Sequence, residues 1–149
     1  MKKANTIYTL GTSTRSLEEF FSILKEYGIK AIADVRRFPK SSRYPHFNRE
    51  NLEEAAGAQE LDYHWLGDVL GGFRKGGYEA YKEEPAYEEG LNRLGDLARD
   101  SLTVFICAER LTWKCHRMHI SRSLMERGWD VIHIIEADRT WQLKEERLE

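Results

Sequence analysis

Two cysteines, a carboxylate, a histidine and several cationic residues lie together in residues 105–117, which read FICAERLTWKCHR. The apolar residues 102–106 that lead into this segment predict a buried strand. Thr112 predicts the N-cap of a following helix, which would place Cys115 in the first helical turn. Backbone N–H groups at a helix N-terminus stabilise a thiolate. The segment therefore predicts a reactive cysteine after a strand, where α/β proteins often bind ligands.

Three residues of this segment are the candidate catalytic residues: Cys115, Glu109 and His116. Arg110 and Arg117 are near Cys115 in sequence, and cationic neighbours favour the nucleophilic thiolate. Glu109 would act as the acid–base, and His116 would assist. The alternative for Cys115 is an unreactive thiol in the core.

Cys107 ends the predicted strand, so packing in the core is its default role. It could instead form a disulfide or a redox pair with Cys115, although disulfides are rare in the cytosol. A zinc site that also uses His116 and His119 is not expected, because the spacing matches no compact zinc motif. We predict no metal and no cofactor.

Positive charge is concentrated early in the chain. Residues 1–50 hold ten Lys/Arg against five Asp/Glu, whereas residues 51–100 hold five against twelve. Residues 36–49 contain five Lys/Arg and no acidic residue. Such a stretch suits a phosphate, a nucleotide or a nucleic-acid backbone, with a solvated loop as the alternative. The predicted anion- or ligand-binding residues are Ser13, Thr14, Arg15, Asp34, Arg36, Arg37, Arg43, Asn48, Gly71, Gly72, Arg110 and Arg117.

Predicted strands and helices alternate along the chain. The strands cover residues 6–10, 31–35, 61–66, 102–106 and 131–135. The helices run from the capping box at Ser16 to Gly28, over residues 48–56, from Pro85, and from Thr112. Residues 67–77 are expected to form a glycine-rich loop, and 142–148 a short helix or a frayed end. This order predicts one α/β domain over residues 1–149, a three-layer Rossmann-like or flavodoxin-like sandwich with a mainly parallel sheet of about five strands.

Right-handed crossovers would place the carboxyl ends of all parallel strands at one edge of the sheet. The candidate residues follow these ends, so we expect them to converge there. Asp34, at the end of a buried strand, should pair with an arginine, because an isolated buried carboxylate is costly. It would orient that arginine or, alternatively, act as a base.

The composition is that of a globular protein, with 41% hydrophobic and 32% charged residues among 149. Apolar runs fall far short of the ~20 residues of a membrane span, and no apolar signal core follows the basic start. We therefore expect a cytoplasmic protein without a membrane partner.

Several motifs together resemble the bacterial and archaeal family called domain of unknown function 488. They are residues 10–15 (LGTSTR), 34–39 (DVRRFP), 47–49 (FNR), 70–72 (LGG), 107–109 (CAE) and 115–117 (CHR). The resemblance extends over nearly the whole chain. The chain departs from it at Thr12, where the family usually has His, and at Tyr81-Lys82, where members often have Tyr-Met. The resemblance implies an α/β fold and a shared site, without a reaction.

The leading functional prediction is an anion-binding active site at the carboxyl edge of the sheet. It would act on a nucleotide or another phosphorylated small molecule through Cys115 and Glu109, as a cysteine-dependent hydrolase or transferase. One alternative is a nucleic-acid-binding module without catalysis, because aromatic residues interleave the basic stretch 36–49. The other is a thiol redox sensor that uses Cys107 and Cys115.

Overall fold

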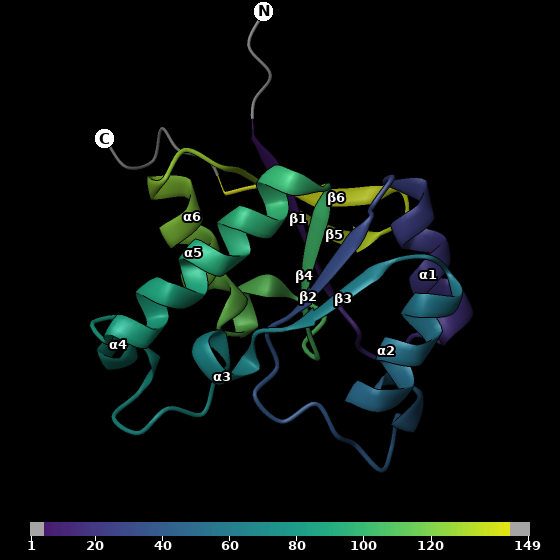
Figure 1. Cartoon of the computed structure of the whole chain (residues 1–149), viewed down its shortest axis with the longest axis horizontal. Helices are drawn as coiled ribbons and strands as arrows, with labels where there is room; N and C mark the ends of the chain where they lie inside the picture. The colour runs from purple at the N-terminus through teal and green to yellow at the C-terminus, as the bar shows by residue number, and fades with distance from the viewer. Residues whose placement is uncertain (1–4, 144–149) are drawn as a thin grey trace, which may run out of the picture.

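The computed structural model describes residues 5–143, apart from the side chain of Lys114. It is the predicted three-layer α/β fold, in which one sheet separates two groups of helices (Figure 1). The strands are β1 (Thr6–Gly11), β2 (Ala31–Asp34), β3 (Asp62–Trp65), β4 (Thr103–Cys107), β5 (Asp130–Glu136) and β6 (Arg139–Trp141). The α-helices are α1 (Leu17–Glu26), α2 (Arg49–Ala58), α3 (Gly67–Leu70), α4 (Tyr78–Tyr81), α5 (Pro85–Asp100) and α6 (Arg117–Glu126). Two 3-10 turns are η1 (Pro45–Phe47) and η2 (Thr112–Lys114).

The sheet has the strand order β3-β2-β4-β1-β5-β6. The first five of these strands are parallel, and β6 pairs with β5 in the antiparallel direction. From β1 the chain crosses toward β2, and from the neighbouring β4 it crosses the other way, toward β5. Ligands of α/β proteins bind at the carboxyl ends of strands where connections diverge in this manner.

Each face of the sheet has its own hydrophobic core. Helices α1 and α2 cover one face, and α3, α5 and α6 cover the other (Figure 1). Because successive side chains of a strand point to opposite faces, Val104 and Ile106 of β4 pack on the α1 side. Phe105 and Cys107 pack on the α6 side. The strand therefore directs Cys107 toward the segment that carries the second cysteine.

Local chemistry explains the ends of α1. The Ser16 hydroxyl accepts a hydrogen bond from the Glu19 backbone N–H at 3.0 Å, which confirms the predicted cap. Gly28 follows the helix with φ of 71°, a conformation that glycine adopts without the steric cost of a side chain. Both ends are thus specified within a few residues.

Some local predictions are wrong. Thr112 does not cap a helix: it begins η2, and α6 begins only at Arg117, so Cys115 lies two residues before the helix. Residues 67–77 are not all loop, because they contain α3. Strand β6 was not predicted. Of the predicted terminal segment 142–148, residues 144–148 lie outside the described part of the chain, and Gln142 and Leu143 are not helical.

Within residues 5–143, no helix is both long enough and apolar enough to cross a membrane.

Candidate functional site

The two cysteines meet at the carboxyl end of β4. Cys107 is the last residue of that strand and is 3% exposed, and η2 returns the chain so that Cys115 lies beside it, half-buried. Both cysteines are free, and their sulfur atoms are 3.0 Å apart. The pair is therefore close enough for one sulfur to hydrogen-bond to the other.

Arg117, the first residue of α6, lies against both sulfurs. Its side chain is completely buried, and its Nε donates to Cys107 Sγ at 3.0 Å and to Cys115 Sγ at 3.4 Å. Its backbone N–H also donates to Cys115 Sγ, at 3.3 Å. A buried guanidinium is costly unless it is paired, and a thiolate is the anion that this geometry can supply.

These contacts separate the pKa values of the two thiols. The hydrogen bond from Cys107, followed by the charge and N–H groups of Arg117, lowers the pKa of Cys115 to about 6 despite partial burial. Burial raises the pKa of Cys107 well above its ordinary value. At neutral pH the pair is therefore a Cys115 thiolate that accepts a hydrogen bond from the Cys107 thiol. The lowered pKa of Cys115 comes from Cys107 and Arg117 and not from the first helical turn in which the sequence analysis had placed this cysteine.

A buried polar network holds Arg117 in place. Its Nη1 donates to Thr9 Oγ1 at 2.9 Å, and Thr9 Oγ1 lies 2.8 Å from Nδ1 of His133. Since the Thr9 oxygen accepts from Arg117, its own hydroxyl proton is available to His133. Thr112 Oγ1 also lies 2.9 Å from this nitrogen. Burial, with a contribution from Arg117, lowers the pKa of His133 to about 3, so His133 is neutral at pH 7.

Sequence reasoning missed Thr9, His133 and Thr112 as members of the site. A signal was present, because His133 interrupts the apolar run 131–135 and must bury its ring in a strand. Buried polar side chains in strands need partners. The partners could not be identified without the order of the strands, since Thr9 and His133 come from neighbouring strands far apart in sequence.

His116 and Glu109 flank the cysteine pair. His116 Nε2 lies 2.9 Å from the carbonyl oxygen of Val35 and must donate to it, which leaves Nδ1 unprotonated in the neutral ring. Burial lowers the pKa of His116. The carboxylate of Glu109 is exposed and accepts from the Leu111 backbone N–H at 3.5 Å, while its backbone carbonyl accepts from Arg117. These contacts do not test the predicted acid–base role of Glu109, which stays a prediction.

The arginines that were predicted to share a phosphate have separate partners. Arg15, with its side chain 3% exposed, donates to the carbonyls of Gly11 and Ile135 and pairs with two glutamates. Arg36 binds both oxygens of the buried Asp34 at 2.8 and 2.7 Å, which confirms the predicted pairing of this carboxylate. Arg37 donates to the carbonyl of Phe73. A phosphate site formed by all three stays a prediction, and the contacts of Arg15 and Arg36 argue against it.

The other candidate residues mostly have structural contacts. Asn48 accepts from the Ser41 N–H at 2.6 Å, Ser13 donates its N–H to Ala108, and Arg110 pairs with Glu136. Thr14 is exposed, and Arg43 lies over the ring of Tyr44. A Cβ at Gly71 would be 2.7 Å from Cα of Arg37, and one at Gly72 would be 3.4 Å from Nδ1 of His116. These two glycines let their loop approach the site.

Two further features bear on ligands. The face of the sheet opposite the cysteines carries Asp34, whose Oδ2 also accepts from the Tyr63 hydroxyl at 2.5 Å. Among the described residues, no group of three or more His, Cys, Asp or Glu side chains is arranged to hold a metal ion.

The fold and the site define a small Rossmann-like α/β protein. Its paired cysteines lie at the carboxyl end of β4, beside β1, where the connections from these two strands diverge. A family model described as "Domain of unknown function DUF488" matches residues 16–124, so the chain belongs to that family. The match includes both cysteines and Arg117, and it begins just after the Gly11–Arg15 loop. Neither a curated protein nor a solved structure is significantly similar to the chain.

Proposed function

We propose that the protein carries out thiol–disulfide exchange, with Cys115 as the nucleophile and Cys107 as the resolving thiol. The observation that carries the proposal is the 3.0 Å separation of the two sulfurs, with the buried Arg117 on both. The lowered pKa of Cys115 makes it the attacking thiolate at neutral pH. Its partial exposure gives a substrate access, whereas Cys107 is shielded.

The reaction has two steps. The Cys115 thiolate attacks one sulfur of a substrate disulfide, R–S–S–R′, forms Cys115–S–S–R and releases R′S⁻. Cys107 then gives its proton to solvent and attacks the Cys115 sulfur, which releases RS⁻ and leaves a Cys107–Cys115 disulfide. Two electrons pass from the protein to the substrate. A small thiol or a dithiol protein restores the reduced pair by the reverse exchange.

The same thiolate could attack a carbonyl or phosphoryl group, as in the cysteine-dependent hydrolase or transferase predicted from the sequence. The position of Cys107 favours exchange instead. A second thiol 3.0 Å away would intercept a mixed disulfide, whereas a hydrolase has no use for it.

The test is a single-turnover reaction of the reduced protein with a chromogenic aromatic disulfide between pH 4 and 9. Wild type should release two thiols per protein and finish as an internal disulfide by mass spectrometry. The rate should rise with a midpoint near 6, well below the ~8.5 of a free cysteine. Cys107→Ala removes the side chain that donates a hydrogen bond to Cys115 and lowers its pKa, so this variant should react more slowly near neutral pH and stop at the mixed disulfide after releasing one thiol.

Two further variants make the test decisive. Cys115→Ser should not react while the protein is folded, because Cys107 is buried. Glu109→Gln should react like wild type, because the Glu109 carboxylate contacts the Leu111 backbone. A midpoint near 8.5, or an internal disulfide that never forms, would rule the proposal out.

A further inference from the structure

Two basic loops that are distant in sequence meet on the surface beside the cysteine site. Arg37, in the loop after β2, donates from Nη1 to the carbonyl of Phe73, in the loop after α3, at 2.6 Å. The rings of Phe38 and Phe73 lie with their centroids 6.0 Å apart. The contact joins residues 36–49 and 69–78, which together hold seven Lys/Arg and no acidic residue; one of the seven, Arg36, is paired with Asp34.

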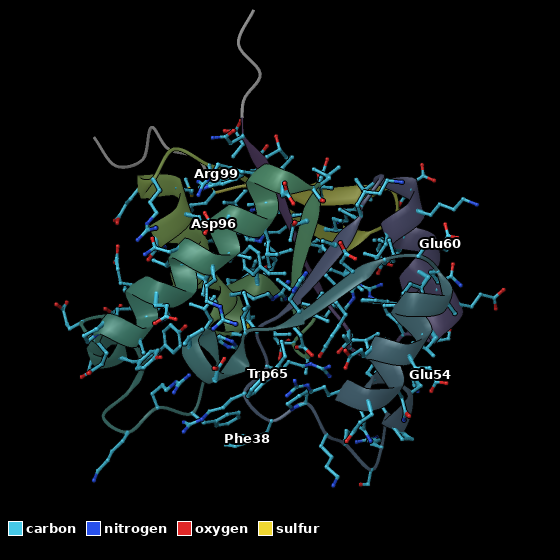
Figure 2. The ribbon with its side chains drawn as sticks, viewed as in Figure 1. Phe38, Glu54, Glu60, Trp65, Asp96 and Arg99 are labelled. Carbon is cyan, nitrogen blue, oxygen red and sulfur yellow. The ribbon has the colours of Figure 1, made fainter. Side chains whose placement is uncertain are left out.

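Both phenylalanines are unusually exposed, at 65% for Phe38 and 84% for Phe73. In Figure 2, Phe38 lies at the lower edge of the molecule, beyond Trp65. Phe73 also has a φ of 59°, which is a strained conformation for a bulky residue. Strain of this kind concentrates at functional sites. The loop therefore holds an apolar ring in water at a cost in stability.

We infer that Phe38 and Phe73, with the surrounding cationic side chains, bind a short single-stranded nucleic acid. Unpaired bases stack on exposed aromatic rings without regard to sequence, and arginine and lysine bind the phosphates between them. The guanidinium of Arg37 lies 5.3 Å from the centroid of the Phe38 ring. Its contact with Phe73 uses one of its five N–H groups, so it can bind a phosphate beside a stacked base.

The distribution of charge favours a single strand over a duplex. The whole chain has a net charge of −2, and residues 51–100 are strongly acidic, so the positive surface is local. A duplex is bound through phosphates over a long footprint and presents no free base faces. A strand of a few nucleotides fits two rings and their adjacent cations. This site adds a function to the proposed thiol chemistry and does not depend on it.

The experiment is fluorescence anisotropy of a labelled single strand of about 12 nucleotides, within the usual range of site sizes. The reduced full-length protein is titrated with DNA and RNA strands and with the matching duplex at several salt concentrations. We expect saturable binding that is tighter for single strands. Phe38→Ala and Phe73→Ala should each weaken it by roughly 5-fold or more, whereas Phe38→Trp and Phe73→Trp should retain it.

Arg37→Ala should lower the slope of log K against log salt by about 0.7, the value for one phosphate on a single strand. The matched control is Arg99→Ala, since Arg99 lies near the opposite end of the molecule from Phe38 and should not change the slope (Figure 2). Equal affinity for duplex and single strands, or unchanged affinity in Phe38→Ala and Phe73→Ala, would overturn the inference. The inference would also be overturned if this surface bound a protein but no nucleic acid.

Discussion

At the scale of single residues, the site depends on one buried cation shared by two sulfurs. Arg117 is completely buried, and its hydrogen-bond acceptors are Cys107, Cys115, Thr9 and the carbonyl of Glu109. Only a thiolate among these partners can neutralise its charge. Burial of the cation and ionisation of Cys115 are therefore two aspects of the same interaction, and a change in either should alter the other.

His133 allows a test of this network through pH. Its pKa is about 3 in the folded protein and about 6.5 in an unfolded chain, so the unfolded state binds an extra proton between these values. Its contribution to stability is therefore complete above pH 6.5 and is lost as pH falls toward 3. Over that window the free energy of unfolding should fall by up to about 1.4 kcal/mol per pH unit because of this residue.

The measurement is urea unfolding of wild type and His133→Asn at pH 7, 6, 5 and 4. An asparagine oxygen can accept from Thr9 and Thr112 but does not titrate. The variant should therefore lose less stability on acidification, and the carboxylates common to both proteins cancel in the comparison. If the free energies of unfolding of the two proteins changed in parallel with pH, His133 would bind a proton as readily in the folded as in the unfolded state, which would contradict the prediction.

At the scale of elements, close approaches of backbone position the loops around the site. Gly67 begins α3, and a Cβ there would lie 2.0 Å from the carbonyl oxygen of Arg36 and 2.5 Å from Nε1 of Trp65. The same carbonyl accepts from that indole N–H at 2.8 Å. The start of α3 is thus pressed against the end of β2, and this contact fixes the path of the glycine-rich loop toward His116.

A matched pair of alanine substitutions tests this contact. Gly67→Ala should destabilise the protein by at least about 1–3 kcal/mol, because backbone must move to admit the methyl group. Gly57→Ala is the control: it lies in α2 with nothing within 4 Å of its Cβ position. There the methyl group should stabilise the helix by about 0.5–1 kcal/mol. Chemical denaturation measures the free energy of unfolding of both variants. Equal changes in the two variants would refute the packing argument.

The elements also show what the sequence could predict. The apolar runs located all five parallel strands, and the Ser16 cap located α1, because these signals are local. Strand β6 was missed because its residues Arg139 and Thr140 are exposed, so it has no apolar pattern. The start of α6 was misplaced because the η2 turn is fixed by contacts such as Thr112 with His133, which sequence spacing does not reveal.

At the scale of the whole molecule, strand order decides which residues form a site. Cys107, Cys115 and Arg117, which come from one segment, lie together at the carboxyl edge, where the sequence predicted that candidate residues would converge. The sequence did not predict that the Arg15 side chain would bind at the end of β5, or that Asp34 would face the α1 side. Those directions depend on the pleat of each strand and on its neighbours.

The thiolate and Arg117 lead to a prediction about the stability of the oxidised protein. A Cys107–Cys115 disulfide joins residues only eight apart in sequence, so its effect on the unfolded chain is worth less than ~3 kcal/mol. Oxidation also removes the anion that faces a buried guanidinium, and an uncompensated buried charge costs about 3–5 kcal/mol. Oxidation should therefore destabilise the fold above the ~8.5 of a free thiol, where the Cys115 thiolate makes its full contribution, and lower Tm there by a few degrees, at roughly 2–4 °C per kcal/mol.

The difference should depend on pH in a definite direction. Because the pKa of Cys115 is about 6, the stabilising thiolate is present above the ordinary thiol pKa and is lost as pH falls through 6. The Tm gap between reduced and oxidised protein should thus shrink at pH 5. Calorimetry of both forms measures it, with Cys107→Ser taken through the same oxidant as the control. A higher Tm on oxidation even above the ~8.5 of a free thiol would show that the disulfide stabilises the fold more than the thiolate does. A pair whose reduced form is the more stable is oxidising, so at equilibrium it would favour the reverse of the exchange written above and take electrons from a substrate dithiol.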